Sequence, residues 1–172
     1  MARKVEEICV NKMKVLVIDP EACTGCEICE LVCSLGKTGA CRPSLSRIKV
    51  VRIENEGVHV PIVCMQCEDA PCKVACPVNA IERDSKTGAM IVDESICIGC
   101  RACTIVCPYG AISIDPKSRK AQTCDLCGGD PLCAKWCPSA ALMFTNEVSA
   151  DMLKRRAVGE RVAQLILKSR SQ

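Results

Sequence analysis

The chain has 172 residues, a net charge of +3 and 18 cysteines, with only one Trp, one Tyr and one Phe. Cysteine at this level indicates either a disulfide framework in a small secreted protein or bound metal in a cytosolic one. The N-terminal stretch MARKVEEICVNKMK carries scattered charges and has no apolar run of signal-peptide length. No segment approaches the roughly 20 apolar residues of a membrane span. We therefore expect a cytoplasmic protein with reduced thiols, and the small net charge argues against nucleic-acid binding.

The first half of the chain alternates predicted strands with cysteine-rich loops. Residues 1–13 are expected to form an N-terminal extension, followed by a strand in KVLVID (14–19). The first cysteine-rich stretch, CTGCEICELVC, comes next (23–33). RIKVVRIE (47–54) and VHVPIV (58–63) flank a short Asn-Glu-Gly turn. This pattern predicts a β-hairpin inserted before the second cysteine-rich stretch.

The second half repeats the same alternation. AIER (80–83) and MIVD (90–93) are predicted strands joined through the turn signal DSKTG. AISID (111–115) precedes a second turn signal, DPKSR, and ALMFT (141–145) is the last predicted strand. Residues 149–170 place apolar side chains on one stripe after a Ser, which predicts a C-terminal helix.

Sixteen of the cysteines form four groups. In chain order the groups are Cys23, Cys26, Cys29 and Cys33; Cys64, Cys67, Cys72 and Cys76; Cys97, Cys100, Cys103 and Cys107; and Cys124, Cys127, Cys133 and Cys137. Groups one and three are siblings, because VIDPEACTGC aligns with IVDESICIGC, and groups two and four share a longer gap before the third cysteine. The order A-B-A-B indicates an internal duplication. Cys9 and Cys41 lie outside the groups and are expected to be free thiols.

The spacing within each group favours an iron–sulfur cubane over zinc. A structural zinc site usually combines two CxxC pairs across a spacer. Here a third cysteine follows closely and a fourth comes one helical turn later, as in ferredoxins whose fourth cysteine ligates the neighbouring cluster. A proline follows the last cysteine in three groups, whereas Ser34 takes that position in group one and leaves the path after Cys33 open. Gly25 and Gly99 are expected to let the backbone approach a cluster and point N–H groups at its sulfurs.

These motifs resemble the bacterial ferredoxin family. The A-B-A-B array with its inserted hairpin is similar to four-cluster ferredoxin-like electron-transfer subunits, over about residues 14 to 145. The resemblance implies an α+β, duplicated bacterial-ferredoxin-like fold, with short hairpins and short helices around four [4Fe-4S] clusters and a C-terminal helix. It also implies an inner module of about 60–115, an outer module of about 14–59 plus 116–145, and a helical tail at 146–172.

The resemblance also implies a function. Such subunits accompany molybdenum or tungsten pterin enzymes, formate and carbon monoxide dehydrogenases, and hydrogenases. The compact size and the CDLCGGDPLCAKWCP motif before a short tail are most similar to the small partners of tungsten aldehyde oxidoreductases, whose relatives include benzoyl-CoA reductases of anaerobic metabolism. We expect a relay of single electrons to or from a larger catalytic subunit, with a further electron carrier or flavin subunit as another candidate partner. The alternatives are a freestanding soluble polyferredoxin, and a relay subunit of a carbon monoxide dehydrogenase, formate dehydrogenase or hydrogenase.

Two assignments of the cysteines to clusters are open. The duplication by itself suggests that groups one and two share one cluster pair and groups three and four another. The resemblance implies nesting instead, and the short segment between Cys76 and Cys97 mildly favours it. In the nested arrangement each cluster takes three cysteines from one group and one from its partner group, with electrons passing in the order one, four, two, three or its reverse. The four sets are then Cys64, Cys67, Cys72 and Cys107; Cys97, Cys100, Cys103 and Cys76; Cys23, Cys26, Cys29 and Cys137; and Cys124, Cys127, Cys133 and Cys33.

No separate catalytic constellation is visible, so we expect a non-catalytic subunit. The only histidine, His59, is expected to be a surface or core residue of a strand, not a base or ligand. Asp19 and Asp93 are expected to shape the turns before ligand loops. Tyr109 and Trp136 each flank a fourth cysteine and are expected to pack on a cluster and limit water access.

Overall fold

The computed structural model describes residues 14–146, 150–152, 154–156, 158–160 and 167. The chain divides into two compact units, one formed by Ile18–Met143 and the other by Met1–Val17 with Phe144–Gln172. All sixteen grouped cysteines fall within the first unit. Within the described part of the chain, no helix combines the length and apolar character needed to cross a membrane. Cys9 lies outside the described residues.

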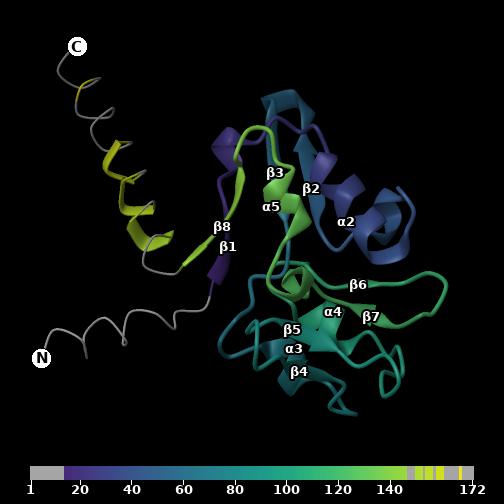
Figure 1. Cartoon of the computed structure of the whole chain (residues 1–172). Coiled ribbons are helices and arrows are strands. Elements are labelled where there is room, and N and C mark those ends of the chain that lie inside the picture. The colour runs from purple at the N-terminus through teal and green to yellow at the C-terminus, as the bar shows by residue number, and fades with distance from the viewer. Residues whose placement is uncertain (1–13, 147–149, 153, 157, 161–166, 168–172) are drawn as a thin grey trace, which may run out of the picture. The chain divides into compact units, whose positions relative to one another are not determined.

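Three of the two-stranded sheets are local antiparallel hairpins, as the turn signals predicted (Figure 1). Their strands are β2 (Lys49–Ile53) with β3 (Val58–Ile62), β4 (Ile81–Arg83) with β5 (Met90–Val92), and β6 (Ser113–Ile114) with β7 (Ala121–Gln122). In the β4–β5 and β6–β7 hairpins an aspartate opens the turn: an Asp84 carboxylate oxygen accepts from the Thr87 N–H at 2.9 Å, and Asp115 accepts from the Lys117 N–H at 2.7 Å. A fourth sheet pairs β1 (Lys14–Ile18) with β8 (Leu142–Asn146).

Each cysteine group leads into one α-helix. The helices are α2 (Ile28–Thr38), α3 (Pro71–Val74), α4 (Ala102–Val106) and α5 (Leu132–Lys135). Short 3₁₀ turns are η1 (Pro20–Ala22), η2 (Pro43–Leu45), η3 (Glu54–Glu56) and η4 (Leu126–Gly128). Helix α2 packs against α5, and α3 packs against α4 (Figure 1). The helices of groups one and four therefore lie together, as do those of groups two and three.

Helix α2 is much longer than the helical turns of the other groups, and Ser34 explains why. The other groups have a proline after the fourth cysteine, which cannot continue a helix. Ser34 is fully buried, and its hydroxyl donates to the Leu31 carbonyl at 2.9 Å and accepts from the Arg42 N–H at 3.0 Å. The helix runs on to Thr38 and ends at Gly39, which adopts a left-handed conformation and donates to the Leu35 carbonyl. The path left open after Cys33 is thus a continued helix.

The interior is made of small apolar residues and cysteines. One buried set combines Ile81, Met90 and Ile112 with Cys72, Cys97 and Cys103. Gly36 of α2 allows close approach to α5, because a Cβ there would lie 2.5 Å from Leu132 Cδ1. In the other unit, residues 150–152, 154–156, 158–160 and 167 are helical, which agrees with the predicted C-terminal helix. The predicted α+β class with short hairpins and short helices is confirmed.

Candidate iron–sulfur sites

One backbone feature recurs in all four groups: the residue before the second cysteine is left-handed. These residues are Gly25, Gln66, Gly99 and Leu126, with φ of 69°, 53°, 70° and 53°. Glycine adopts this conformation freely, but other residues pay about 1–2 kcal/mol. Gln66 is held by two hydrogen bonds, from its amide nitrogen to the Cys124 carbonyl at 2.7 Å and from the Met90 N–H to its amide oxygen at 2.6 Å. Leu126 is held by nearly complete burial.

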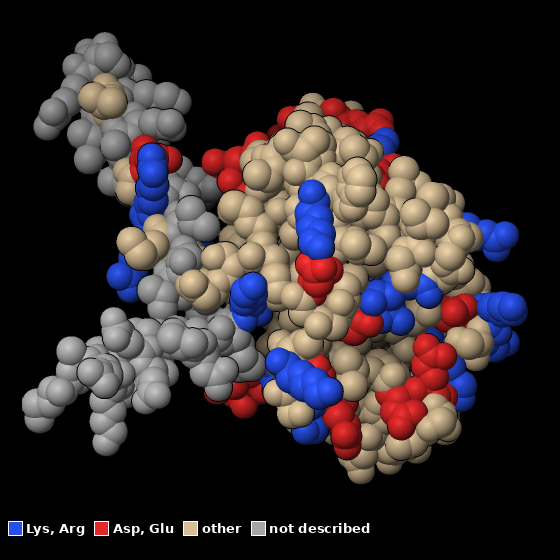
Figure 2. Space-filling model, viewed as in Figure 1, with Lys and Arg blue, Asp and Glu red and all other residues tan. Residues whose placement is uncertain are grey.

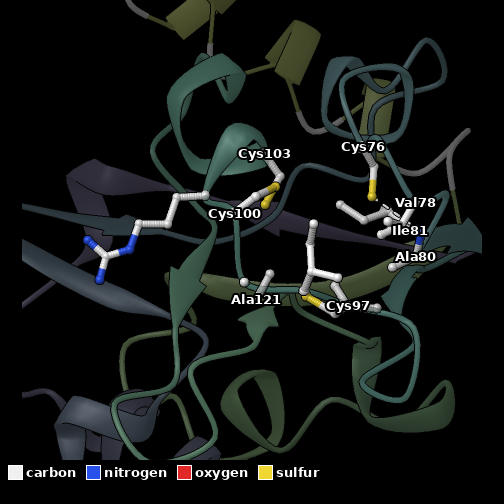
Figure 3. A pocket seen from close by; sticks show the side chains of 12 residues that line it. Cys76, Val78, Ala80, Ile81, Cys97, Cys100, Cys103 and Ala121 are labelled. Carbon is white, nitrogen blue, oxygen red and sulfur yellow. Dashed lines mark hydrogen bonds between the residues drawn. The ribbon is translucent and has the colours of Figure 1, made fainter.

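The first thiol set surrounds a small, largely apolar pocket and combines groups three and two. Cys97, Cys100 and Cys103 line it together with Cys76. Figure 3 shows Cys76 across the pocket from Cys100 and Cys103, with Cys97 at its base and apolar Ile81, Ala80 and Ala121 around them. Cys76 follows α3, and its sulfur accepts from the Ala80 N–H at 3.2 Å. Four sulfurs from two separate elements thus face one apolar space.

A second small, apolar pocket brings together groups one and four. Cys23, Cys26 and Cys29 line it with Cys137, which follows α5. Val50 and Pro61, opposite each other on β2 and β3, form one wall. The inserted hairpin predicted from the sequence therefore covers this thiol set.

The raised pKa values of buried thiols indicate the other two sets. Burial raises the pKa of Cys64 to about 11, and Cys72, Cys67 and Cys107 raise it further because neighbouring negative charges oppose ionisation. Burial likewise raises the pKa of Cys133, and Cys124, Cys33 and Cys127 contribute in the same direction. Cys107 therefore lies beside the first three cysteines of group two, and Cys33 beside those of group four. Buried, mutually repelling thiolates are the environment that a bound metal cluster neutralises.

The same electrostatic interactions between thiols indicate which cysteine groups are neighbours. Cys29 of group one contributes to the raised pKa of Cys133 in group four, after burial and nearer thiols. Burial raises the pKa of Cys124 to about 12, with Cys64 of group two as a further cause. Burial also raises the pKa of Cys103 in group three, and Cys72 of group two adds to it. These electrostatic interactions relate the groups in the order one, four, two, three.

A basic side chain contacts each ligand loop. Arg52 Nη2 donates to the Gly25 carbonyl at 3.3 Å, Arg83 donates to the Cys67 carbonyl, and Lys120 donates to the Cys97 carbonyl. In group four the partner is a carboxylate: Asp125 accepts from the Cys127 N–H at 3.0 Å and pairs with two cations. Burial works against ionisation of Asp125, but the Lys37 hydrogen bond and the charges of both cations lower its pKa.

The remaining predicted residues have mixed outcomes. Asp19 accepts from the Glu21 N–H at 3.1 Å and Asp93 from the Ser95 N–H at 2.8 Å, so both shape turns as predicted. His59 lies half-buried on β3, as expected of a strand residue. The prediction for Tyr109 and Trp136 is wrong: they are 50% and 63% exposed, too open to limit water access. Tyr109 follows Pro108, whereas Trp136 lies at the end of α5 before Cys137, and the spacing of either residue to a cysteine does not report the direction of its side chain.

Sequence reasoning missed three residues that organise the sites: Gln66, Arg47 and Asp125. Gln66 occupies a position where group one and group three have glycine, and this alignment could have flagged it. Asp125 directly follows the first cysteine of group four. In the other three groups the first cysteine is not followed by an acidic residue, so this difference was also a signal in the sequence. Arg47 lies fourteen residues after Cys33, and no local pattern connects the two.

The donor sets suit a cluster of several irons. Each of the two pockets is lined by four cysteines, the ligands of [4Fe-4S] clusters, around a largely apolar space. Within the described residues, no three His, Cys, Asp or Glu side chains come close enough together to hold one metal ion. Comparison with known proteins identifies the cofactor directly. The family described as a 4Fe-4S dicluster domain matches residues 55–147.

The chain belongs to this 4Fe-4S dicluster family. An aliphatic sulfonate oxidoreductase, polyferredoxin-like subunit, from Pyrococcus furiosus is 44% identical over 125 residues, covering 73% of this chain and 72% of the relative. An uncharacterised ferredoxin of Methanocaldococcus jannaschii is 39% identical over 145 residues (82% and 85%). Formate hydrogenlyase subunit 2 of Escherichia coli is 32% identical over 178 residues (82% and 86%). The protein is thus an iron–sulfur electron-transfer protein of the ferredoxin type, with four [4Fe-4S] clusters for its four cysteine groups.

A solved structure is also similar: the BamBC active-site complex of benzoyl-coenzyme A reductase with benzoyl-CoA. The identity is 25% and the TM-score 0.48, over 93% of this chain and 98% of that chain. The family assignment rests on the sequence relatives and the family match.

Proposed function

We propose that this protein is the electron-relay subunit of a larger oxidoreductase. The proposal is supported by the thiols of different groups that raise one another's pKa in the order one, four, two, three within the unit formed by Ile18–Met143. [4Fe-4S] clusters accept and release single electrons at potentials set by their surroundings. Seven of the sixteen grouped cysteines are buried, seven are partly buried, and Cys26 and Cys100 are exposed.

We propose the nested assignment of the sixteen cysteines. The pocket shared by Cys97, Cys100, Cys103 and Cys76, and that shared by Cys23, Cys26, Cys29 and Cys137, support two of the sets. The neighbours of Cys64 and Cys133 support the sets completed by Cys107 and Cys33. The packing of α3 with α4 and of α2 with α5 supports the same grouping. On this assignment an inner module of about 60–115 carries groups two and three, and an outer module of about 14–59 plus 116–145 carries groups one and four.

Gln66 has a particular position in such a relay. Its side chain joins the Cys124 carbonyl of group four to the Met90 N–H of β5. The Thr123 hydroxyl also donates to the Met90 carbonyl, at 2.6 Å. Because groups four and two adjoin here, these bonds fix the spacing between the outer and inner modules. Electron transfer between centres depends on such a fixed distance.

We propose a larger catalytic oxidoreductase subunit as the partner. The Pyrococcus furiosus relative is named as a subunit of an aliphatic sulfonate oxidoreductase, and the Escherichia coli relative as a subunit of formate hydrogenlyase. Among partner classes we favour a tungsten or molybdenum pterin oxidoreductase, as the sequence resemblance implies. On the face shown in Figure 2, basic and acidic side chains are interspersed, which suits a protein partner better than nucleic acid. We place the complex in the cytoplasm, where reduced thiols persist.

Anaerobic purification of the full chain from its native source tests this proposal. We expect one larger catalytic subunit to co-purify in constant stoichiometry, and about sixteen irons with negligible zinc per chain. A chain that elutes alone with its full iron content, while oxidoreductase activity elutes elsewhere, would contradict the relay subunit and support a freestanding polyferredoxin.

A further inference from the structure

Two cations converge on one carboxylate inside the ligand loop of group four. Asp125 lies between Cys124 and Cys127 in sequence, and its oxygens are 2.7 Å from Lys37 Nζ and 3.0 Å from Arg47 Nη1. The side chains of Lys37 and Arg47 are only 18% and 19% exposed. Two positive charges against one negative charge leave a net positive charge beside this thiol set, shielded from water.

Arg47 reaches the same thiol set from its other side. Its backbone N–H donates to Cys33 Sγ at 3.4 Å, and Cys33 lies beside Cys124 and Cys133. The residue therefore extends from the Cys33 sulfur to the carboxylate that caps the Cys124–Cys127 loop. Its Nε is buried and has no hydrogen-bond partner among the described residues. A buried guanidinium N–H is rarely left unpaired, so an acceptor is expected at this position.

The other groups use their cations differently. Arg52, Arg83 and Lys120 donate to backbone carbonyls of ligand loops. None of these three side chains has a buried nitrogen without a partner in the described part of the chain. Among these cations of the ligand loops, Arg47 is the one in the described part of the chain that keeps a buried nitrogen without a partner after its ion pair forms, while His59 near group one also has a buried Nδ1 without one. This arrangement depends on the continued helix α2, which carries Lys37 in its last turn.

We propose that Arg47 Nε donates a hydrogen bond to a sulfur of the group-four cluster, and that Arg47 and Lys37 raise the reduction potential of that cluster. The proposal rests on the assignment of Cys33 to group four made above. Reduction adds negative charge to a cluster, so a nearby cation and an N–H donor stabilise the reduced form more than the oxidised form. Arg47 is a positioning residue for the cofactor. With Arg47 in place, the group-four cluster, the second in the proposed series, would accept an electron more readily than it would without the arginine.

An EPR-monitored redox titration of the full four-cluster protein tests the proposal. Cys127→Ser first identifies the group-four signal, and Cys23→Ser identifies that of group one. We expect Arg47→Gln to make reduction of the group-four centre about tenfold less favourable, a shift of about 59 mV downward. Asp125→Asn should shift the same centre upward, because the amide oxygen can still accept from the Cys127 N–H while the negative charge is lost. Arg42→Gln is the matched control, since Arg42 is exposed and close in sequence, and it should leave all four potentials unchanged.

The outcomes separate this proposal from the one it rests on. All four potentials unchanged in Arg47→Gln and Asp125→Asn, at full iron content, would overturn the role of Arg47 and leave the relay function standing. A shift confined to the signal of group one or of group two would instead show that Cys33 is assigned to the wrong set. If Arg47→Gln loses iron, Arg47→Lys keeps the charge but not the Nε donor. A smaller downward shift in that variant supports the proposal, and an unchanged potential contradicts the hydrogen bond.

Discussion

Gly25 combines two constraints that glycine alone meets. Its φ is 69°, and a Cβ there would lie 2.7 Å from the His59 ring, which packs against the ligand loop from β3. The sibling Gly99 also has a positive φ, and its Cβ would collide with the Arg119 carbonyl. The two glycines that the sequence analysis placed near clusters thus also allow a hairpin to pack closely on each loop.

Replacing Gly25 by alanine should therefore cost more than backbone strain alone. Gly57→Ala is the matched control, because Gly57 has a similar φ of 64° but open space around the added Cβ. We expect Gly57→Ala to lose about 1–2 kcal/mol of unfolding free energy. Gly25→Ala should lose more and should release iron faster on anaerobic heating, followed by visible absorbance. Adding His59→Ala should restore part of the loss. Equal losses in the two single variants would show that the ring does not restrain the loop.

Residue identity predicted the glycine positions but not their non-glycine counterparts. Gly25 and Gly99 predict a left-handed turn because glycine favours this conformation, whereas Gln66 and Leu126 adopt the same conformation through tertiary contacts. Gln66 depends on partners 24 and 58 residues away. No local pattern encodes such bonds. The exposed Trp136 fails for the same reason, since its direction is set by packing and not by its distance from Cys137.

Helix α2 shows at the scale of elements how one substitution redirects the chain. Ser34 stands where three groups have proline, and it lets the helix continue far enough to bring Lys37 to Asp125. The hairpins could be predicted, because Asp84 and Asp115 mark their turns locally. The pairing of β1 with β8 could not, because the two strands lie more than a hundred residues apart and neither carries a signal for the other.

Ser34→Pro would match the other groups in sequence but should be harmful in this structure. Proline in the interior of α2 removes a helical hydrogen bond and clashes with the preceding turn, at a cost of about 3 kcal/mol or more. Ser34→Ala should cost about 1–3 kcal/mol, because the fully buried Ser34 hydroxyl is lost and the Arg42 N–H loses its acceptor. Iron content and the rate of cluster loss would rank the variants. A proline variant as stable as the wild type would mean that α2 need not continue beyond Cys33.

Over the whole unit formed by Ile18–Met143, two duplicated halves give one series of four thiol sets. Duplication alone suggests tandem pairs, but Cys29 of group one raises the pKa of Cys133 in group four, and Cys64 of group two raises that of Cys124 in group four. The chain would then cross from outer to inner module between groups four and two, where Gln66 ties them together. The sequence left tandem and nested arrangements open because cysteine spacing within a group says nothing about which groups meet.

Exchange of a single fourth ligand tests the nested relay most directly. Cys33→Ala and Cys137→Ala form a matched pair, since each removes one sulfur from the end of an outer group. The account predicts that Cys33→Ala changes the EPR signal of the group-four cluster and leaves that of group one intact, and that Cys137→Ala does the reverse. If Cys33→Ala altered the signal of group two instead, the nested arrangement would be wrong and the tandem arrangement correct.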